Sequence, residues 1–338
     1  MGNDYSSRDN LIDILKFVAS IFIVGIHTGI CSDSTSVAWQ FDSLLRLAVP
    51  FFIMCSGYYL GEKCEIHKRK IEDSAHNRNV FLYFVKKIGI LYVVWSIIYL
   101  FISIPEWIET GWFSAWAFVD WGIALLIKGS YYHLWYLLFL IYAVAILFFI
   151  TKKITVKVFP VLILPLYLIE VIQYGYRWVM PEVIQDFLIV FDKIPCLSAV
   201  TRVLPFLMLG MYVSQEKKKE HTNLIGFITI SFIILVVERN FLLNNGQLNV
   251  SYIVGTLLVS YFLFQFIIHK KNIIQKRNFK VMSQIGMNIY MVHPIFIRVL
   301  QYFDITRKGC SFIIVLLASY IWGVIILKIV KLLEKIHR

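Results

Sequence analysis

Long apolar stretches alternate with short polar and basic segments along most of the chain. A transmembrane helix needs roughly 20 predominantly apolar residues to cross the hydrocarbon core of a bilayer. Stretches of about that length occur at about residues 11–31, 44–61, 80–103, 133–150, 156–174, 198–214, 223–241, 248–268, 281–303 and 310–330. The pattern predicts an all-α integral membrane protein with about ten transmembrane helices, forming a single domain over residues 1–338.

One further apolar stretch, at about residues 114–127, is shorter and contains Trp116, Asp120 and Trp121, with Trp112 just before it. Stretches of about 10–14 apolar residues are more often interfacial or re-entrant than spanning, and tryptophan favours the membrane interface. We therefore expect this segment not to cross the membrane. An even number of spans then places both termini on the same side.

Basic residues are gathered in short clusters between the apolar stretches, for example at residues 68–70, 217–219 and 270–271. With ten spans and the N-terminus inside, most of the 33 Lys and Arg residues lie on the inner side, as the positive-inside rule requires. A crossing at 114–127 would move every cluster from Lys152 onward to the outside. The charges therefore predict cytoplasmic termini in a multi-pass protein of the cell (plasma) membrane.

The composition agrees with this pattern. Hydrophobic residues make up 59% of the chain and charged residues only 16%, against about 25% charged residues in a soluble domain. A soluble fold around one aqueous core is thereby excluded. The net charge of +12 reflects the orienting clusters, so we expect no nucleic-acid partner. The five cysteines are scattered without a CxxC pair, so we expect no metal site and no disulfide framework.

The first apolar stretch carries three ionisable residues on one face of the expected helix. Lys16 and His27 share a side of that helix and lie about 16 Å apart along its axis, and Asp13 is close to the same line. Charged groups at membrane depth are costly and by default mark a functional site. The alternative is that Asp13 and Lys16 reach the membrane surface from the helix end, while His27 bonds to a neighbouring backbone group.

Other spans carry ionisable residues at similar depth. These are Arg46, His133 (followed by Trp135), Arg202, Glu238 and His293. We expect them to line an outward-facing binding or catalytic cavity together with His27. Structural alternatives stay open: a lipid-headgroup anchor for Arg46, an aromatic-belt position for His133, and a buried ion pair between Glu238 and Arg202.

Two lysines, Lys86 and Lys87, begin the third span on the inner side. Their presence there is explained by positive-inside charge alone. They also suit a seat for a polyanionic cytoplasmic ligand, because lysine binds phosphate groups well.

Several of these segments, taken in order, resemble the acyltransferase 3 family of integral membrane acyltransferases. Lys16 and His27 match the family's Arg/Lys-x10-His signature, with Asp13 in the usual place before it. Further matches are the segment from Val49 to Leu60, Lys86-Lys87, the block His133-Leu134-Trp135-Tyr136, Arg202 with Pro205-Phe206 and Gly210, and the segment from Gly286 to Pro294. The resemblance covers about residues 8–330.

Within the family, the likeness is to the membrane domain of the serine racemases of vancomycin resistance, carried by the segment from Arg46 to Leu60, the His133 block and the Glu238 position. Those proteins have a pyridoxal-phosphate racemase domain after the membrane part, whereas this sequence ends at Arg338. We expect a stand-alone acyltransferase or the N-terminal part of a longer fusion with a covalently linked racemase domain.

The resemblance implies a membrane-bound O-acyltransferase that moves an acyl group, expected to be acetyl, from cytoplasmic acyl-CoA to an acceptor hydroxyl. His27, with Asp13 and Lys16, would be catalytic, and His27 would act as general base or transient acyl carrier. Lys86, Lys87 and Lys16 would hold acetyl-CoA, a substrate rather than a tightly bound cofactor. The acceptor would contact Arg46, His133, Trp135, Arg202, Glu238 and His293, among which Arg202 or His133 would stabilise the oxyanion and Glu238 would orient the acceptor.

A polar cavity at membrane depth with proline-broken helices also describes a transporter. In that alternative, Glu238 and Arg202 would bind the amino and carboxylate groups of a small neutral amino acid such as L-serine, supplied for antibiotic resistance. The absence of an internal repeat and the basic residues at the inner side favour the acyltransferase.

Overall fold

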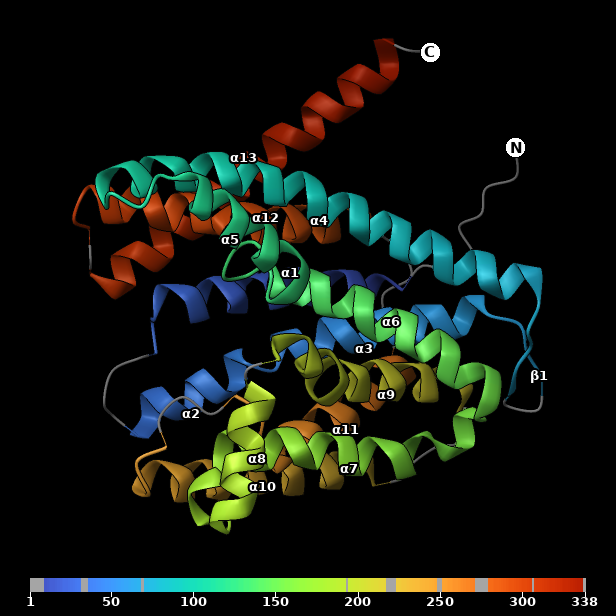
Figure 1. Cartoon of the computed structure of the whole chain (residues 1–338). Coiled ribbons are helices and arrows are strands. Elements are labelled where there is room, and N and C mark those ends of the chain that lie inside the picture. Colours follow the sequence, from blue (N-terminus) through green and yellow to red (C-terminus); the bar gives the residue numbers. More distant parts are fainter. Residues whose placement is uncertain are drawn as a thin grey trace. The chain divides into compact units, whose positions relative to one another are not determined.

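The computed structural model describes residues 9–31, 36–67, 70–192, 194–216, 223–247, 251–270, 279–305 and 307–336, and these residues are largely helical (Figure 1). Contacts between Cα atoms divide the chain into two compact units. The first unit consists of Met1–Phe52, Glu220–Asn244 and Gly255–Arg338, and the second consists of Ile53–Lys219 and Asn245–Val254. A single domain over residues 1–338 stays a prediction.

The first unit is built from helices at both ends of the chain. Its elements are α1 (Asn10–Thr28), α2 (Ser36–Leu45), the start of α3 (Ala48–Lys63), α10 (Leu224–Asn244), α11 (Val254–Lys270), α12 (Lys280–Tyr302) and α13 (Lys308–Ile336). Helix α12 packs between α1 and α13, around an apolar core that includes Val24, Ile289 and Val315. A Cβ on Gly286 would lie only 3.0 Å from the Cα of Phe17, so α12 approaches α1 closely at that point.

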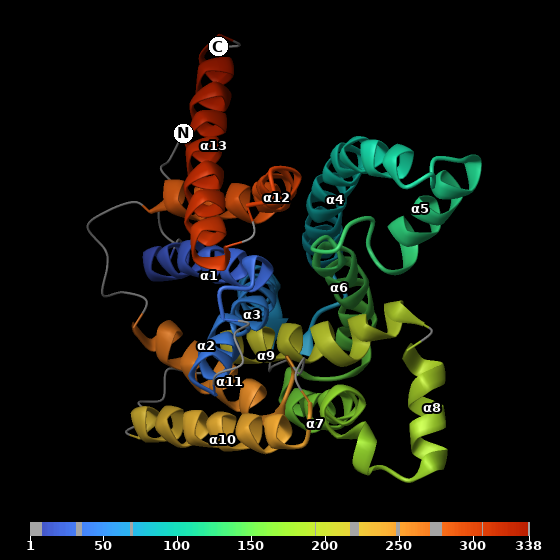
Figure 2. The same cartoon turned by 90° about the vertical axis from the view of Figure 1, so that its left-hand side faces the viewer.

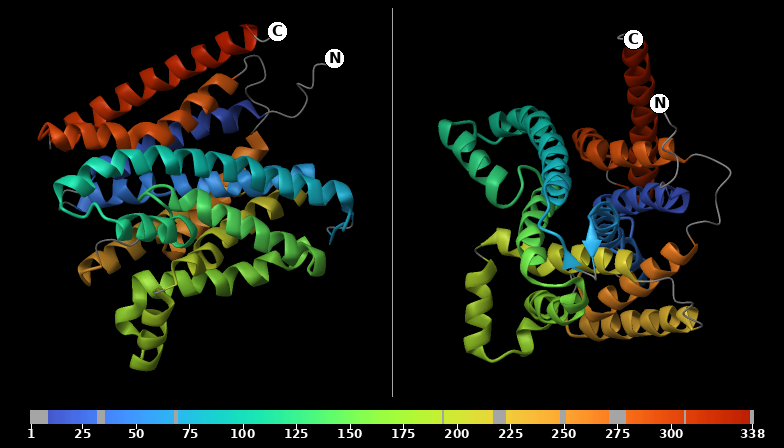
Figure 3. Two further views of the ribbon diagram at one scale, coloured as in Figure 1. Left: turned by 45° about the horizontal axis from the view of Figure 1, so that its top comes forward. Right: turned by 90° about the vertical axis from the view of Figure 1, so that its right-hand side faces the viewer.

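The second unit contains the middle of the chain. It holds the rest of α3, then β1 (Ile66–His67), β2 (Lys70–Ile71), α4 (Ala75–Glu109), α5 (Ala115–Ile127), α6 (Trp135–Lys153), α7 (Phe159–Val171), α8 (Glu182–Asp192) and α9 (Leu204–Gln215). The short helix α5 folds back beside the end of α4 (Figure 2). The strands form a two-residue antiparallel pair on the segment leading into α4, visible as small arrows in Figure 3.

Two glycines allow α3 and α9 to cross in close contact inside the second unit. A Cβ on Gly57 would lie 2.0 Å from the carbonyl oxygen of Leu207, and a Cβ on Gly210 would lie 2.1 Å from that of Met54. No side chain fits at such separations, so glycine is required at both positions. The glycines in the sequence motifs around residues 49–60 and 205–210 therefore serve helix packing.

Within the described residues, eight helical stretches are long and apolar enough to cross a membrane. They are Asn10–Thr28, Gln40–Lys63, Ala75–Glu109, Trp135–Lys153, Val156–Val179, Pro195–Gln215, Leu224–Asn244 and Lys308–Lys335. Helices α5 and α11 are apolar but shorter, and α12 is not among the eight. The helices and their hydropathy support an all-α, multi-pass membrane protein, while the count of ten spans and the side of each terminus stay predictions.

Some sequence expectations differ from the structure in detail. The expected span at 44–61 begins within α2, which ends at Leu45 before α3 begins at Ala48. The amphipathic helix α8 and the paired strands were not expected, because both are too short to give a hydropathy signal. Of the basic residues that fix the orientation, Arg8, Lys68, Arg69, Lys217, Lys218, Lys219, Lys271, Lys276, Arg277 and Arg338 lie outside the described residues.

Candidate functional site

Helix α1 carries Asp13, Lys16 and His27 in a single uninterrupted run. Asp13 is 2% exposed and lies in the first turn, where the positive end of the helix dipole stabilises a carboxylate. His27 is in the last turn, just before Gly29 ends the helix in the left-handed conformation at φ 65°. The cap therefore fixes the end of the helix and, with it, the position of the His27 side chain.

The imidazole of His27 is stacked on that of His293. The ring centroids are 5.1 Å apart and the ring planes differ by 29°. His293 is completely buried in α12, and the close packing of α12 on α1 brings the two rings together. Sequence reasoning placed both residues in one cavity, and the structure does bring these two side chains into contact.

Arg46 belongs to a charged cluster in the same unit. Its Nε donates to Oδ2 of Asp42 at 2.5 Å, and the same carboxylate oxygen lies 3.8 Å from Nη2 of the fully buried Arg239. Sequence reasoning missed Asp42, although its position four residues before Arg46 on a helix was a usable signal.

Glu238 has a structural contact in this unit. Its carboxylate accepts a hydrogen bond of 2.7 Å from the backbone N–H of Gly255, at the start of α11. Helix N-termini have backbone N–H groups without helical partners, so the carboxylate caps α11. This contact accounts for one oxygen of Glu238 and leaves its expected role with the acceptor as a prediction.

Arg202, in the second unit, forms its ion pair with Glu170. Its Nε donates to Oε1 of Glu170 at 2.6 Å, and Thr201 donates to the other carboxylate oxygen at 2.8 Å. Sequence reasoning left open an ion pair between Arg202 and Glu238, but the carboxylate that pairs with Arg202 is that of Glu170. Glu170 was overlooked in the stretch 156–174, although it too is an ionisable residue in an apolar run.

Three aromatic rings surround the same guanidinium. The Cζ atom of Arg202 lies 5.2 Å from the ring centroid of Trp135, 5.0 Å from that of Tyr174 and 4.9 Å from that of Tyr252. These distances are those of cation–π contacts, which are strongest when water is excluded. Together with Glu170, the rings fix the position of this cation.

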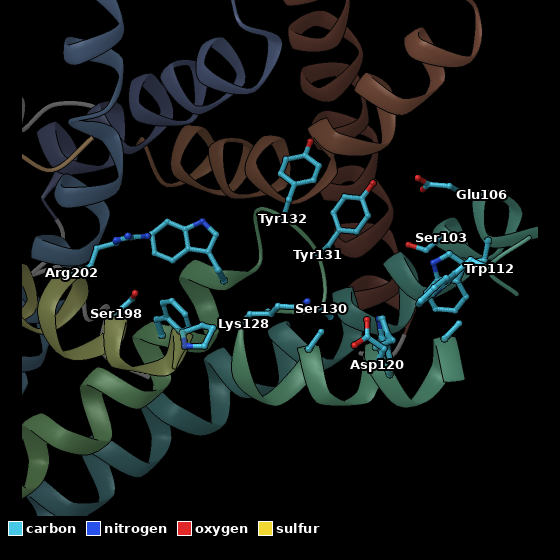
Figure 4. A pocket seen from close by; sticks show the side chains of 18 of the residues that line it. Ser103, Glu106, Trp112, Asp120, Lys128, Ser130, Tyr131, Tyr132, Ser198 and Arg202 are labelled. Atoms are coloured by element: carbon cyan, nitrogen blue, oxygen red, sulfur yellow. The ribbon is translucent and has the colours of Figure 1, made fainter. Parts of the chain in front are cut away.

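A cavity of about 740 Å³ opens beside Arg202 within the second unit. Arg202 lies at one side of it, and Asp120 and Glu106 lie at the other (Figure 4). Trp135, whose ring contacts the Arg202 guanidinium, also lines the cavity. Tyr131 and Tyr132 line it between these two sides. The short helix α5, expected as a non-spanning segment, contributes Ala117, Asp120, Trp121 and Ala124 to the wall. The cavity thus combines aromatic surface with both acidic and basic groups, which suits a polar ligand with flat or ring-shaped faces.

The remaining predicted site residues lie elsewhere. His133 is 1% exposed and packs edge-on against the rings of Tyr99 and Tyr131, with ring centroids 4.9 and 5.8 Å apart. Lys86 and Lys87 are exposed on α4. Lys16 is half-buried on α1. A role for these lysines in holding acyl-CoA stays a prediction.

Comparisons with known proteins give two relatives and a family. An amino-acid racemase of Enterococcus faecalis is 24% identical over 347 residues, which cover 97% of this chain and 47% of that protein. Another amino-acid racemase of the same organism is 27% identical over 237 residues, covering 65% of this chain and 31% of that protein. The chain thus spans less than half the length of these relatives. No solved structure matches the chain.

The family model described as an acyltransferase domain matches residues 9–328, nearly the whole chain. The match includes α1 with its histidine, the crossing of α3 and α9, and α12 with the second histidine. This result confirms the resemblance seen in the sequence motifs. The chain belongs to the acyltransferase 3 family of membrane acyltransferases.

Proposed function

We propose that the chain is a membrane-bound O-acyltransferase that moves an acyl group, acetyl in the first instance, from cytoplasmic acyl-CoA to a hydroxyl group of an acceptor at or across the membrane. Family membership supports the reaction type. The observation that carries the proposal is the stacking of the His27 imidazole on that of His293. A purely structural membrane scaffold would have no need of two stacked imidazole rings inside apolar helices.

In the proposed reaction, His27 takes the proton from the acceptor hydroxyl while the hydroxyl oxygen attacks the thioester carbonyl. The tetrahedral oxyanion then collapses, the carbon–sulfur bond breaks, and the CoA thiolate leaves and receives the proton. Histidine suits both proton transfers because its ordinary pKa lies near neutral pH. A route in which His27 itself carries the acyl group between donor and acceptor stays open.

The donor and the acceptor are assigned to separate groups of residues. We propose that Lys86, Lys87 and Lys16 hold the phosphates and pantetheine arm of acyl-CoA, because phosphate groups attract lysine ammonium groups. We propose that the acceptor binds in the first unit, beside His27, through Arg46 and Glu238. These two charged side chains would suit an acceptor with several polar groups.

The alternative function is transport of a small neutral amino acid such as L-serine in vancomycin resistance. Its support is that both relatives are named amino-acid racemases, so that a supply of amino acid would suit a linked racemase domain. The cavity has acidic groups and Arg202 on opposite sides, which fits an ammonium and a carboxylate. However, the two side chains first assigned to the amino acid already have partners. Arg202 is paired with Glu170, and Glu238 accepts a hydrogen bond from the N–H of Gly255.

Calorimetry with acetyl-CoA on the purified chain in nanodiscs separates the two functions. The acyltransferase predicts micromolar binding that is lost in the Lys86→Ala/Lys87→Ala variant and kept in Lys153→Ala/Lys157→Ala, which removes the same charge from other exposed positions. No binding by folded protein, together with uptake of radiolabelled L-serine into proteoliposomes, would overturn the acyltransferase in favour of transport.

A further inference from the structure

His293 is followed directly by a proline inside helix α12. Pro294 has no backbone N–H, so the carbonyl oxygen of Tyr290, four residues earlier, lacks its helical donor. A buried carbonyl without a donor is destabilising, and a side chain that can donate will satisfy it. The sequence Tyr290-Met291-Val292-His293-Pro294 places the imidazole within reach of that oxygen.

The ring of His293 makes this contact. Its Nδ1 lies 2.9 Å from the carbonyl oxygen of Tyr290 and 3.1 Å from that of Ile289. Carbonyl oxygens only accept hydrogen bonds, so Nδ1 must carry a proton. The side chain is completely buried, and a fully buried imidazole is neutral because charge is expensive to bury. A neutral ring protonated at Nδ1 has an unprotonated Nε2.

The same ring packs against His27. The stack at 5.1 Å means that any rotation of His293 about its side-chain bonds would move the surface on which the imidazole of His27 rests. An imidazole that acts as a base must present a defined nitrogen in a defined direction, and a neighbouring group usually sets both. The Tyr290 carbonyl, which has no helical donor because of Pro294, holds the His293 ring rigidly, since it belongs to the helix backbone.

We propose that Pro294 fixes His293 as the Nδ1-protonated tautomer, and that the anchored ring makes His293 a positioning residue for His27. The first part stands on the geometry of α12 alone. The second part rests on the proposed function, because it assigns His293 a place in acyl transfer. His293 thus belongs with His27 rather than among the groups that contact the acceptor.

Nitrogen-15 NMR of the full chain in nanodiscs, labelled on its histidine rings, tests the first part. Protonated and unprotonated ring nitrogens resonate in separate regions, and the His293 signals are assigned by their loss in the His293→Asn variant. We expect a protonated Nδ1 and an unprotonated Nε2. In Pro294→Ala the new N–H competes for the Tyr290 carbonyl, so the tautomer preference of His293 should weaken.

An internal control is available in α11. The Nδ1 of His269 lies 2.8 Å from the carbonyl oxygen of Gln265 without a proline after it, so its signals should not change in Pro294→Ala. A wild-type His293 protonated at Nε2, or an unchanged tautomer in Pro294→Ala, would overturn the proposal.

Acyl transfer from radiolabelled acetyl-CoA tests the second part. Pro294→Ala should lower the rate by about 10- to 100-fold, as misplacement of a catalytic group does, with acetyl-CoA affinity unchanged. Pro165→Ala, which removes a proline inside α7 that does not follow a histidine, should keep the rate within about twofold of wild type. A full rate in a Pro294→Ala protein whose tautomer has changed would disprove the positioning role. Wild-type protein without transfer activity would instead overturn the proposed function, while the resonances still decide the tautomer.

Discussion

The Nε atom of Arg202 lies 2.6 Å from Oε1 of Glu170, and this pair is largely withdrawn from solvent, with 18% of the Arg202 side chain and 1% of the Glu170 side chain exposed. Breaking a buried pair by removing one partner leaves an uncompensated charge and costs about 3–5 kcal/mol. Since three aromatic rings and Thr201 hold the same two groups, the pair fixes one side of the cavity.

We therefore expect Glu170→Ala to lower the thermal unfolding midpoint of the chain clearly in detergent. The matched control is Glu182→Ala, which removes an exposed carboxylate from α8 and should leave the midpoint nearly unchanged. Differential scanning fluorimetry of the three proteins gives the comparison. Equal midpoints for the two variants would show that the Glu170 carboxylate does not stabilise Arg202.

A second prediction concerns the close crossing of α3 and α9. A Cβ on Gly57 would overlap the carbonyl oxygen of Leu207, so Gly57→Ala must push the helices apart and should sharply reduce the yield of folded protein. Gly122→Ala in α5 meets nothing within 4 Å and should preserve or slightly raise the yield, because alanine favours a helix. Size-exclusion chromatography of fluorescently tagged variants measures both. A normal profile for Gly57→Ala would contradict the close crossing.

Thiol labelling tests the topology that the basic clusters predict. Cys310 is exposed at the start of α13, and ten spans with a cytoplasmic N-terminus place it outside the cell. A membrane-impermeant maleimide should therefore label Cys310 on intact cells, and Cys310→Ser should remove most of that signal. Labelling of Cys310 only after permeabilisation would reverse the predicted orientation.

Cys64 provides the contrasting case. It is 8% exposed, and burial, helped by the neighbouring Glu65, raises the pKa of its thiol to about 12. The reactive thiolate is scarce below that pH, so maleimide should react with Cys64 much more slowly than with Cys310 even after permeabilisation, and raising the pH toward 9 should leave the thiol mostly protonated. Mass spectrometry of the labelled peptides distinguishes the two sites. Equal labelling of both thiols at neutral pH would show that Cys64 is not shielded.

The sequence could predict the helix class and the histidine on α1, because hydropathy reports each span and helical periodicity reports which side chains share a face. It could not predict which helices are neighbours. His27 and Arg202 show this limit clearly. The contact of His27 with His293 joins distant parts of the chain, and the partner of Arg202 is Glu170 rather than Glu238. Ionisable residues at similar depth look alike in a sequence, whereas packing decides which of them meet.

The cavity was also beyond sequence reasoning. The stretch at 114–127 was correctly recognised as a short apolar segment, but hydropathy cannot show that such a helix folds back beside α4 and forms a wall. Asp42 was missed for a different reason. It lies before the expected second span, and only the structure shows that its carboxylate joins Arg46 to the buried Arg239.

A radiolabel assay on a His27 variant shows whether His27 performs acyl transfer. Membranes containing wild-type or His27→Ala protein are supplied with radiolabelled acetyl-CoA, and label transferred to non-protein material is counted alongside free CoA. Removal of a general base slows a reaction by about 100-fold or more. We therefore expect transfer by wild type and almost none by a His27→Ala protein with an unchanged thermal midpoint. Full transfer by folded His27→Ala would contradict it.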